Sequence, residues 1–164
     1  MWEFQSEEGK RASAKAMRLL ETMSRTEKGL TEKLRQAGFS ESAIQEGVAY
    51  VRSFGYLNDR RFAEGFISAR ISCRSRQKIL QELMQKGVDR QTALEAWDEI
   101  CSLEEPDEKA MIRDLLEKKY KDLDPQNEKE LRRAIGFLQR RGFTFSDIKN
   151  VFHDLFIEKE RCRL

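Results

Sequence analysis

The sequence has few of the side chains from which enzymes and metal sites are built. It contains one histidine, His153, and three cysteines, Cys73, Cys101 and Cys162. The cysteines are odd in number, far apart and outside any Cys-x-x-Cys spacing, which is typical of a reducing compartment and argues against a structural metal. The sequence also lacks a glycine-rich phosphate loop, a nucleophile elbow and a pair of metal ligands on one helical face. We therefore expect a protein that is not an enzyme and uses no cofactor.

Prolines, alternating strand patterns and long apolar runs are also scarce. With only two prolines and no alternating Val/Ile/Thr runs, the sequence predicts an all-α fold. No segment resembles a secretory leader or approaches the roughly 18 apolar residues of a membrane span, so we expect a cytoplasmic protein with no membrane partner. Charged residues make up 37% of the chain and hydrophobic residues 39%, a balance typical of thin amphipathic helices. The net charge of +2 indicates no partner by itself.

One pattern of apolar residues and glycine occurs three times. Shifting the sequence by 49 residues, and then by a further 55, brings the copies into register. The matched positions are Leu30, Leu34, Gly38, Phe39, Ile44, Val48 and Val51 in the first copy, Ile79, Leu83, Gly87, Val88, Ala93, Trp97 and Ile100 in the second, and Ala134, Leu138, Gly142, Phe143, Ile148, Phe152 and Leu155 in the third. Such a repeat predicts a row of small helical units that share stacked interfaces.

Each copy contains the signals that end one helix and begin the next. Apolar residues four apart lie on one helical face, and the glycine after them can adopt the left-handed conformation that ends a helix. An apolar residue follows, and then Ser40, Asp89 or Thr144, whose side-chain oxygen can cap the next helix. The pattern therefore predicts a helix, a glycine turn and a second helix in every copy.

Together with a preceding helix in each copy, this pattern predicts an elongated tandem array of three three-helix repeats, about nine helices in all. We expect the repeats to span residues 1–57, 58–104 and 105–164. The first helical pattern runs over residues 12–23, and Ser24 and Asp124 are the predicted N-caps of the second and eighth helices. Small residues recur at Gly47 and Gly65, which we interpret as sites of close helix contact.

Basic residues at the start of the middle helices carry the best functional signal. Arg25 and Arg74 occupy equivalent positions; Arg76 and Lys78 extend that end in the second repeat, and Arg132 and Arg133 in the third. Cations recurring at one place in a repeat array would form a stripe able to follow a phosphate backbone or an acidic protein groove. The alternative is an ordinary solvated helix face, as is common in a highly charged chain. Phe137 and Phe145 lie outside the repeated positions and would either stack on bases or pack against neighbours.

Two segments of the second repeat resemble a known family. The segment Gly55-Tyr-Leu-Asn-Asp-Arg-Arg-Phe-Ala63, followed by Phe66, Ile67 and Arg70, and the segment Ile79-Leu-Gln-Glu-Leu-Met-Gln-Lys-Gly-Val88 are similar to the most distinctive parts of the RecX family of bacterial recombination regulators. The resemblance extends over nearly the whole chain but is loosest in the third repeat. Where family members often have glycine, this chain has Cys73-Arg74-Ser75.

The resemblance implies a non-enzymatic negative regulator of RecA, the ATPase that polymerises on single-stranded DNA in homologous recombination, DNA repair and the SOS response. The partners it implies are the RecA filament, in whose groove the chain would lie as a monomer, and single-stranded DNA within that filament. Binding there would limit filament extension, ATP hydrolysis and strand exchange, with Arg61 and Arg70 of the junction as further contact residues. Two other functions remain open from the residues alone: a helical-repeat scaffold for protein partners, and nucleic-acid binding without RecA.

Overall fold

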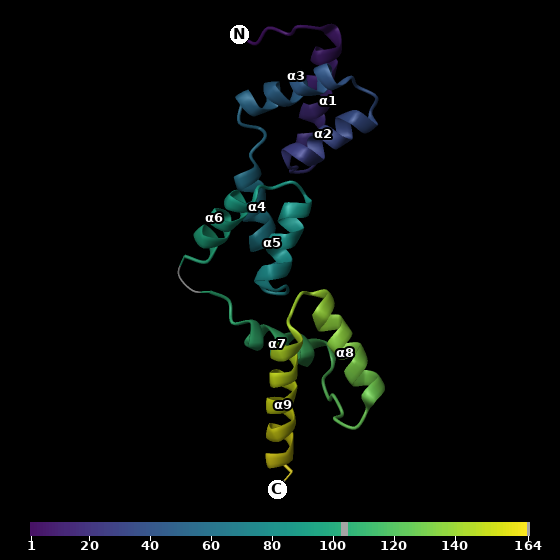
Figure 1. Cartoon of the computed structure of the whole chain (residues 1–164), viewed down its shortest axis with the longest axis vertical. Helices are drawn as coiled ribbons and strands as arrows, with labels where there is room; N and C mark the ends of the chain where they lie inside the picture. The colour runs from purple at the N-terminus through teal and green to yellow at the C-terminus, as the bar shows by residue number, and fades with distance from the viewer. Residues whose placement is uncertain (103–104, 164) are drawn as a thin grey trace. The chain divides into compact units, whose positions relative to one another are not determined.

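The computed structural model describes residues 1–102 and 105–163, and within them nine α-helices and no strands are found (Figure 1). The helices are α1 Glu7–Thr22, α2 Glu27–Gln36, α3 Glu41–Ser53, α4 Asp59–Ser68, α5 Arg76–Gln85, α6 Arg90–Ile100, α7 Glu108–Lys119, α8 Glu128–Arg140 and α9 Phe145–Arg161. They follow one another in threes, with the middle helices α2, α5 and α8 each ending at a repeated glycine. The predicted all-α class is confirmed. The predicted limit at residue 104 lies outside the described residues.

The three repeated glycines end the middle helices as the sequence predicts. Gly38, Gly87 and Gly142 have φ values of 88°, 92° and 89°, which side chains other than glycine rarely adopt. In each turn the amide after the glycine donates to the carbonyl five residues before it: Phe39 to Leu34 (3.4 Å), Val88 to Leu83 (3.0 Å) and Phe143 to Leu138 (3.3 Å). This Schellman arrangement uses helix-end carbonyls that would otherwise lack partners.

Three of the five predicted caps are confirmed, and two are wrong. Ser40, Asp89 and Thr144 accept hydrogen bonds from the amides three residues ahead, as predicted. The predicted cap at Ser24 is wrong, because α2 begins at Glu27 and the hydroxyl of Thr26 accepts from the Gly29 amide at 3.0 Å. The predicted cap at Asp124 is also wrong.

At the eighth helix, the Asp124 carboxylate closes a short turn by accepting from the Gln126 amide at 2.9 Å. The helix itself begins later, and Asn127 caps it by accepting from the Glu130 amide at 3.2 Å. The first helix, in contrast, begins earlier than predicted. It begins at Glu7 rather than at residue 12, because Ser6 supplies the cap by accepting from the Gly9 amide at 2.9 Å.

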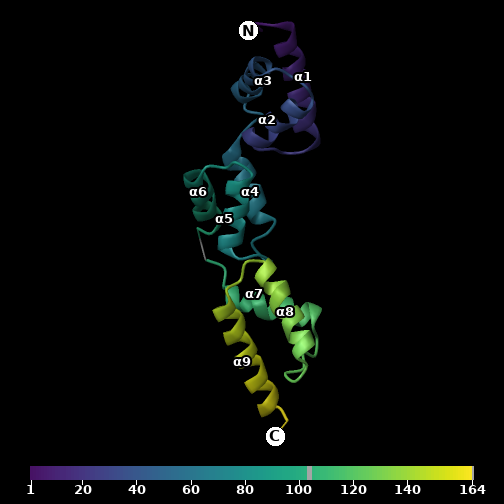
Figure 2. The ribbon, with the colours of Figure 1, turned by 45° about the vertical axis from the view of Figure 1, so that its right-hand side comes forward.

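The chain divides into two compact units, and the boundary between them falls within the second repeat. One unit contains Met1–Ile67 and Leu80–Ile100, and the other contains Ser68–Ile79 and the chain from Cys101 onward. In the first unit α1 packs against α3, and in the second α9 packs against α7 and α8 (Figure 2). The first and third repeats each have an apolar cluster of their own. Full burial of a Leu or Ile side chain contributes about 1.5–3 kcal/mol to the free energy of unfolding.

The two clusters are built largely from the repeated positions. In the first repeat the buried members are Ala16, Leu30, Leu34, Ile44, Val48, Val51 and Leu57. In the third they are Ile112, Leu116, Leu123, Ala134, Phe137, Leu138, Phe143, Ile148, Val151 and Phe152. The second repeat buries the matching residues Ile79, Leu83, Val88, Ala93 and Trp97. The apolar pattern read from the sequence therefore marks the interior of every repeat, except at Ile100, which ends α6 and is exposed.

The two helical glycines differ in their surroundings. A Cβ at Gly47 would lie 3.1 Å from the Ala12 backbone carbonyl carbon and 3.2 Å from the Ser13 nitrogen, so α1 and α3 approach closely there, as predicted. A Cβ at Gly65 would meet nothing within 4 Å. The prediction of close contact at Gly65 is wrong, because this position on α4 is exposed.

Candidate nucleic-acid interface at the repeat joints

The start of a middle helix packs against the glycine turn of the next repeat, and this joint occurs twice. In the first joint the Thr26 hydroxyl donates to the Lys86 carbonyl at 2.6 Å. In the second, the Ser75 amide donates to the Arg141 carbonyl at 3.0 Å. Thr26 and Ser75 are only 3% and 1% exposed, and their hydroxyls also cap α2 and α5. We call these the first joint (Thr26, Lys28, Lys86, Gly87) and the second joint (Ser75, Lys78, Arg141, Gly142).

A carboxylate from the next repeat closes each joint. The Glu27 amide donates to the Asp59 carboxylate at 2.9 Å, and the Arg76 amide donates to the Glu108 carboxylate at 2.8 Å. Both acceptors are the first residue of the following repeat's first helix. A negative charge beside the first amide of a helix satisfies that donor and favours the helix dipole. At the first joint, burial disfavours the charged form of the Asp59 carboxyl group and raises its pKa. The hydrogen bond from the Glu27 amide lowers the pKa but offsets this effect only in part.

The joints explain a second requirement for glycine. A Cβ at Gly87 would lie under 3.0 Å from the Cβ of Lys28, and a Cβ at Gly142 would lie equally close to the Cβ of Lys78. A Cβ at Gly38, in the first repeat, would meet nothing within 4 Å. The glycines at both joints therefore allow a positive φ and also the close approach of a neighbouring helix.

The structure places three of the predicted site residues together. Arg74, Arg76 and Lys78 flank Ser75 along the chain at the second joint; Arg76 is exposed, and the other two are half-buried. The first turn of α5 contains no acid, whereas α2 begins with Glu27. Its cations oppose the helix dipole, and Glu108 offsets them from outside the helix.

The other predicted site residues lie apart from this group in the sequence and occupy varied settings. Arg25 precedes Thr26 at the first joint and is half-buried, and its Nε atom has no hydrogen-bond partner. Arg61 is exposed in the first turn of α4, and Arg70 is half-buried just after that helix. Arg132 and Arg133 are exposed on α8, where Arg132 pairs with Glu128 at 3.2 Å. A contact role for these residues stays a prediction.

Three cations of the third repeat were missed by the sequence interpretation. Arg141 contributes its carbonyl to the second joint, and its guanidinium carbon lies 3.9 Å from the centre of the Phe137 ring. The ammonium group of Lys119 lies 4.0 Å from the same centre, and Arg140 folds back over Gly136. The Arg140-Arg141 pair is visible in the sequence, but its position beside Ser75 depends on the docked glycine turn.

The two aromatic candidates have different roles. Phe137 is 6% exposed and packs edge-on against Tyr120, with ring centres 6.1 Å apart. It is therefore a core residue, so base stacking by Phe137 is excluded. Phe145 is 57% exposed at the first residue of α9.

Metal sites and membrane-spanning helices are absent from residues 1–102 and 105–163. No group of three or more His, Cys, Asp and Glu side chains is placed to hold a metal ion there. None of the helices in this part of the chain combines the length and apolar character that a membrane crossing requires.

Comparison with protein families matches all three repeats. Models described as the first, second and third three-helix domains of RecX match residues 12–50, 58–96 and 107–152. The chain belongs to the RecX family. The three RecX domains follow one another in the expected order, so the tandem array of three-helix repeats is established, although the limits predicted for each repeat extend beyond the matched residues.

Curated RecX relatives cover most of the chain. A Regulatory protein RecX from Trichlorobacter lovleyi is 35% identical over 141 residues, which are 84% of this chain and 90% of the relative. One from Caldanaerobacter subterraneus subsp. tengcongensis is 32% identical over 147 residues, 89% of this chain and 71% of the relative. The chain spans 66% of a Clostridium perfringens relative that is 29% identical to it.

Two solved RecX structures share the fold. The crystal structure of RecX from Lactobacillus salivarius matches with a TM-score of 0.61 at 19% identity, covering 92% of this chain and 98% of that one. A crystal structure described as regulatory protein RecX matches with a TM-score of 0.63 at 18% identity, covering 88% of this chain and 72% of that one.

Proposed function

We propose that this RecX family member binds the filament that RecA forms on single-stranded DNA and limits its extension. The observation that carries the proposal is the succession of three RecX domains along one chain. A bound chain would reduce ATP hydrolysis and strand exchange by the filament. It would act in the cytoplasm as a monomer, without a cofactor and without catalysing a reaction.

The repeat joints support this function physically. A helical filament of RecA and DNA presents phosphates and protein carboxylates along a groove, and both attract cations. Arg74, Arg76 and Lys78 gather at the second joint, held to a rigid backbone by Ser75 and Glu108. Because these hydrogen bonds already hold the backbone amides of Ser75 and Arg76, binding orders less backbone here than on a mobile loop.

The test is the rate of ATP hydrolysis by RecA on single-stranded DNA as this chain is added. We expect the rate to fall with dose, and to fall further when the chain is added during filament growth than after assembly is complete. Added to RecA without DNA, the chain should leave the low basal rate unchanged. An unchanged rate on DNA at a severalfold excess over RecA would contradict the proposal and would favour a scaffold for other protein partners.

A further inference from the structure

We propose that the second joint is a binding site for single-stranded nucleic acid, in which Lys78, Arg140 and Arg141 hold phosphates and Phe145 stacks on a base. The site deepens the proposed function, since it would supply the DNA contact of the filament-bound chain, and it rests on that function for its biological role. The contact itself belongs to this chain alone. Binding is therefore expected without RecA.

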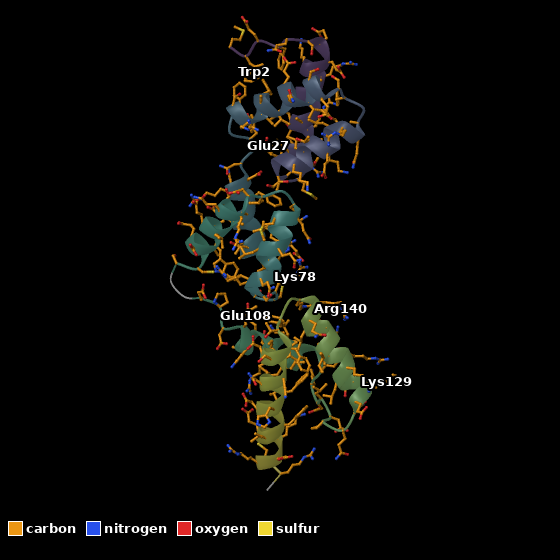
Figure 3. All side chains as sticks on the ribbon, viewed as in Figure 1. Trp2, Glu27, Lys78, Glu108, Lys129 and Arg140 are labelled. Carbon is orange, nitrogen blue, oxygen red and sulfur yellow. The ribbon has the colours of Figure 1, made fainter. Side chains whose placement is uncertain are left out.

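The cations of the site come from two repeats that meet at one turn. Lys78 packs its Cβ against Gly142, and the Ser75 amide bonds the carbonyl of Arg141 at 3.0 Å. Figure 3 labels Lys78 near the start of α5 and Arg140 at the end of α8, the two helix ends that this joint connects. All of these residues belong to one compact unit, so the arrangement is built into its packing.

The ring of Phe137 orients Arg141 and one further cation, Lys119. The guanidinium carbon of Arg141 and the ammonium nitrogen of Lys119 lie 3.9 Å and 4.0 Å from the centre of that ring. Cation–π contacts orient such groups while leaving their hydrogen-bond donors available. Lys119 therefore adds a fourth positive charge beside the phosphate-binding residues.

The nearby carboxylates already accept hydrogen bonds from the protein. Glu108 accepts from the Arg76 amide at 2.8 Å, and Asp147 accepts from the Thr144 hydroxyl at 2.8 Å. The start of α5 is thus occupied by Glu108, so the site depends on cationic side chains rather than on the free amides of a helix end. With Glu108 and Asp147 engaged in this way, the cations Lys78, Lys119, Arg140 and Arg141 provide the attraction for phosphates.

Phe145 gives the site its preference for single strands. It lies three residues after Gly142, is 57% exposed and takes part in none of the ring contacts found among the described residues. An exposed phenylalanine contributes nothing to the core that its neighbours Phe143 and Ile148 form. Unpaired bases stack on such rings whatever their sequence, whereas the bases of a duplex are already stacked on one another.

The first joint likewise bonds the carbonyl before its glycine, through the Thr26 hydroxyl rather than a backbone amide, but its surface differs. Its residues equivalent to Arg76, Arg140 and Phe145 are Glu27, Gln85 and Arg90. Glu27 pairs with Arg52, and no aromatic ring follows the glycine turn, where Val88, Asp89 and Arg90 stand. The first joint is therefore a control for contacts that any repeat joint would make.

The experiment measures binding of the full chain to a fluorescein-labelled oligothymidylate of about 16 nucleotides, within the range of single-strand sites. A duplex of equal length serves as the second probe, and RecA is absent. The double variant Lys78→Glu with Arg140→Glu should lower affinity for the single strand at least tenfold and flatten its salt dependence by about 0.7 for each cation lost. Phe145→Ala should lower it at least fivefold while leaving duplex binding unchanged, and Phe145→Trp should retain it.

Lys28→Glu is the matched control, because Lys28 contacts Gly87 as Lys78 contacts Gly142. It should bind both probes like the parent, and circular dichroism should show equal helix content in all variants. The inference is overturned if the parent does not bind the single strand, if Phe145→Ala binds it like the parent, or if Lys28→Glu loses as much as the double variant. Loss on cation reversal without loss at Phe145 would show that the cations bind phosphates without base stacking, which overturns the role of Phe145 and the single-strand preference. Inhibition of RecA is measured separately, so the proposed function can stand when this site fails.

Discussion

Thr26 and Lys86 are 60 residues apart, and the buried hydroxyl of Thr26 donates a 2.6 Å hydrogen bond to the Lys86 carbonyl while accepting one of 3.0 Å from the Gly29 amide. One oxygen atom thus starts α2 and attaches it to the turn that ends α5. The Thr26→Val variant keeps the shape but leaves both partners unsatisfied, and each buried unsatisfied polar group costs about 1–3 kcal/mol. We expect a loss of about 2–4 kcal/mol in the free energy of unfolding.

Urea denaturation of the first-joint variant measures that loss, and Thr26→Ser is its control. Serine supplies the same donor and acceptor and should remain within about 1 kcal/mol of the parent. If valine and serine at this position were equally stable, the hydroxyl would have no structural role.

The glycine turns give the second prediction. Gly38→Val and Gly87→Val both place a β-branched residue at positive φ, which costs about 1–3 kcal/mol. At Gly87 the new side chain also meets the Cβ of Lys28, whereas at Gly38 it meets open space. We therefore expect Gly87→Val to be the more destabilising by at least about 1 kcal/mol.

Denaturation midpoints and slopes of the two glycine variants, compared under one set of conditions, test this difference. Equal losses would mean that only backbone strain matters at these turns and that the contact with Lys28 relaxes at no cost.

Asp59 gives a prediction about pH. Burial raises the pKa of its carboxyl group, so the folded state holds this proton more tightly than the unfolded state does. The free energy of unfolding contributed by Asp59 must then fall as pH rises from about 4 through the folded pKa, and stay level above it. Asp59→Asn keeps an oxygen to accept from the Glu27 amide and removes this titration.

The measurement is the difference in free energy of unfolding between Asp59→Asn and the parent at pH 4 and at pH 7. We expect this difference to shift in favour of the asparagine variant at the higher pH. Glu41 is a contrasting site, because its hydrogen bond with Arg35 lowers its pKa, so Glu41→Gln should shift the difference in the opposite direction. A shift of the same sign for both variants would contradict the assignment.

Local chemistry explains why much of the fold could be predicted from the sequence. Gly87 and Asp89 act within a few residues of themselves, and the positive φ of the one and the capping bond of the other appear as expected. The cap at Thr26 was missed because Ser24 fits the same local rule. What distinguishes Thr26 is the carbonyl of Lys86, which no local pattern reveals.

The candidate site was less predictable because it depends on contacts between repeats. Arg74, Arg76 and Lys78 could be located by repeat register, which fixes their place at the start of α5. Their neighbours in the third repeat, Arg140 and Arg141, could not be located in this way. The repeat register points to the start of α8, whereas the glycine turn at the end of α8 packs against Ser75. The ring of Phe137 was ambiguous for a similar reason, since Lys119 comes from another helix.

The last prediction concerns the predicted basic residues as contacts of the RecA filament. Replacing Arg74, Arg76 and Lys78 with glutamate removes three cations from one end of α5 and adds three negative charges. The dose of the triple variant that halves RecA ATPase on single-stranded DNA should rise at least tenfold. A tenfold change is about 1.4 kcal/mol, a modest amount for three reversed contacts.

Stability must be checked beside activity in the triple variant, because the Arg76 amide bonds Glu108 and an acid at this position would face that carboxylate. The single variant Lys78→Glu avoids the clash and should still raise the half-inhibitory dose severalfold. Lys118→Glu is the control, since Lys118 is exposed on α7 and pairs only locally, with Asp114 one turn away at 2.7 Å. Lys119 would be a poor control, because it packs on Phe137 beside Arg141. If the triple variant and Lys78→Glu both inhibited as strongly as Lys118→Glu, the basic residues of α5 would be solvated surface, and the filament contact would have to be sought at Arg61 and Arg70.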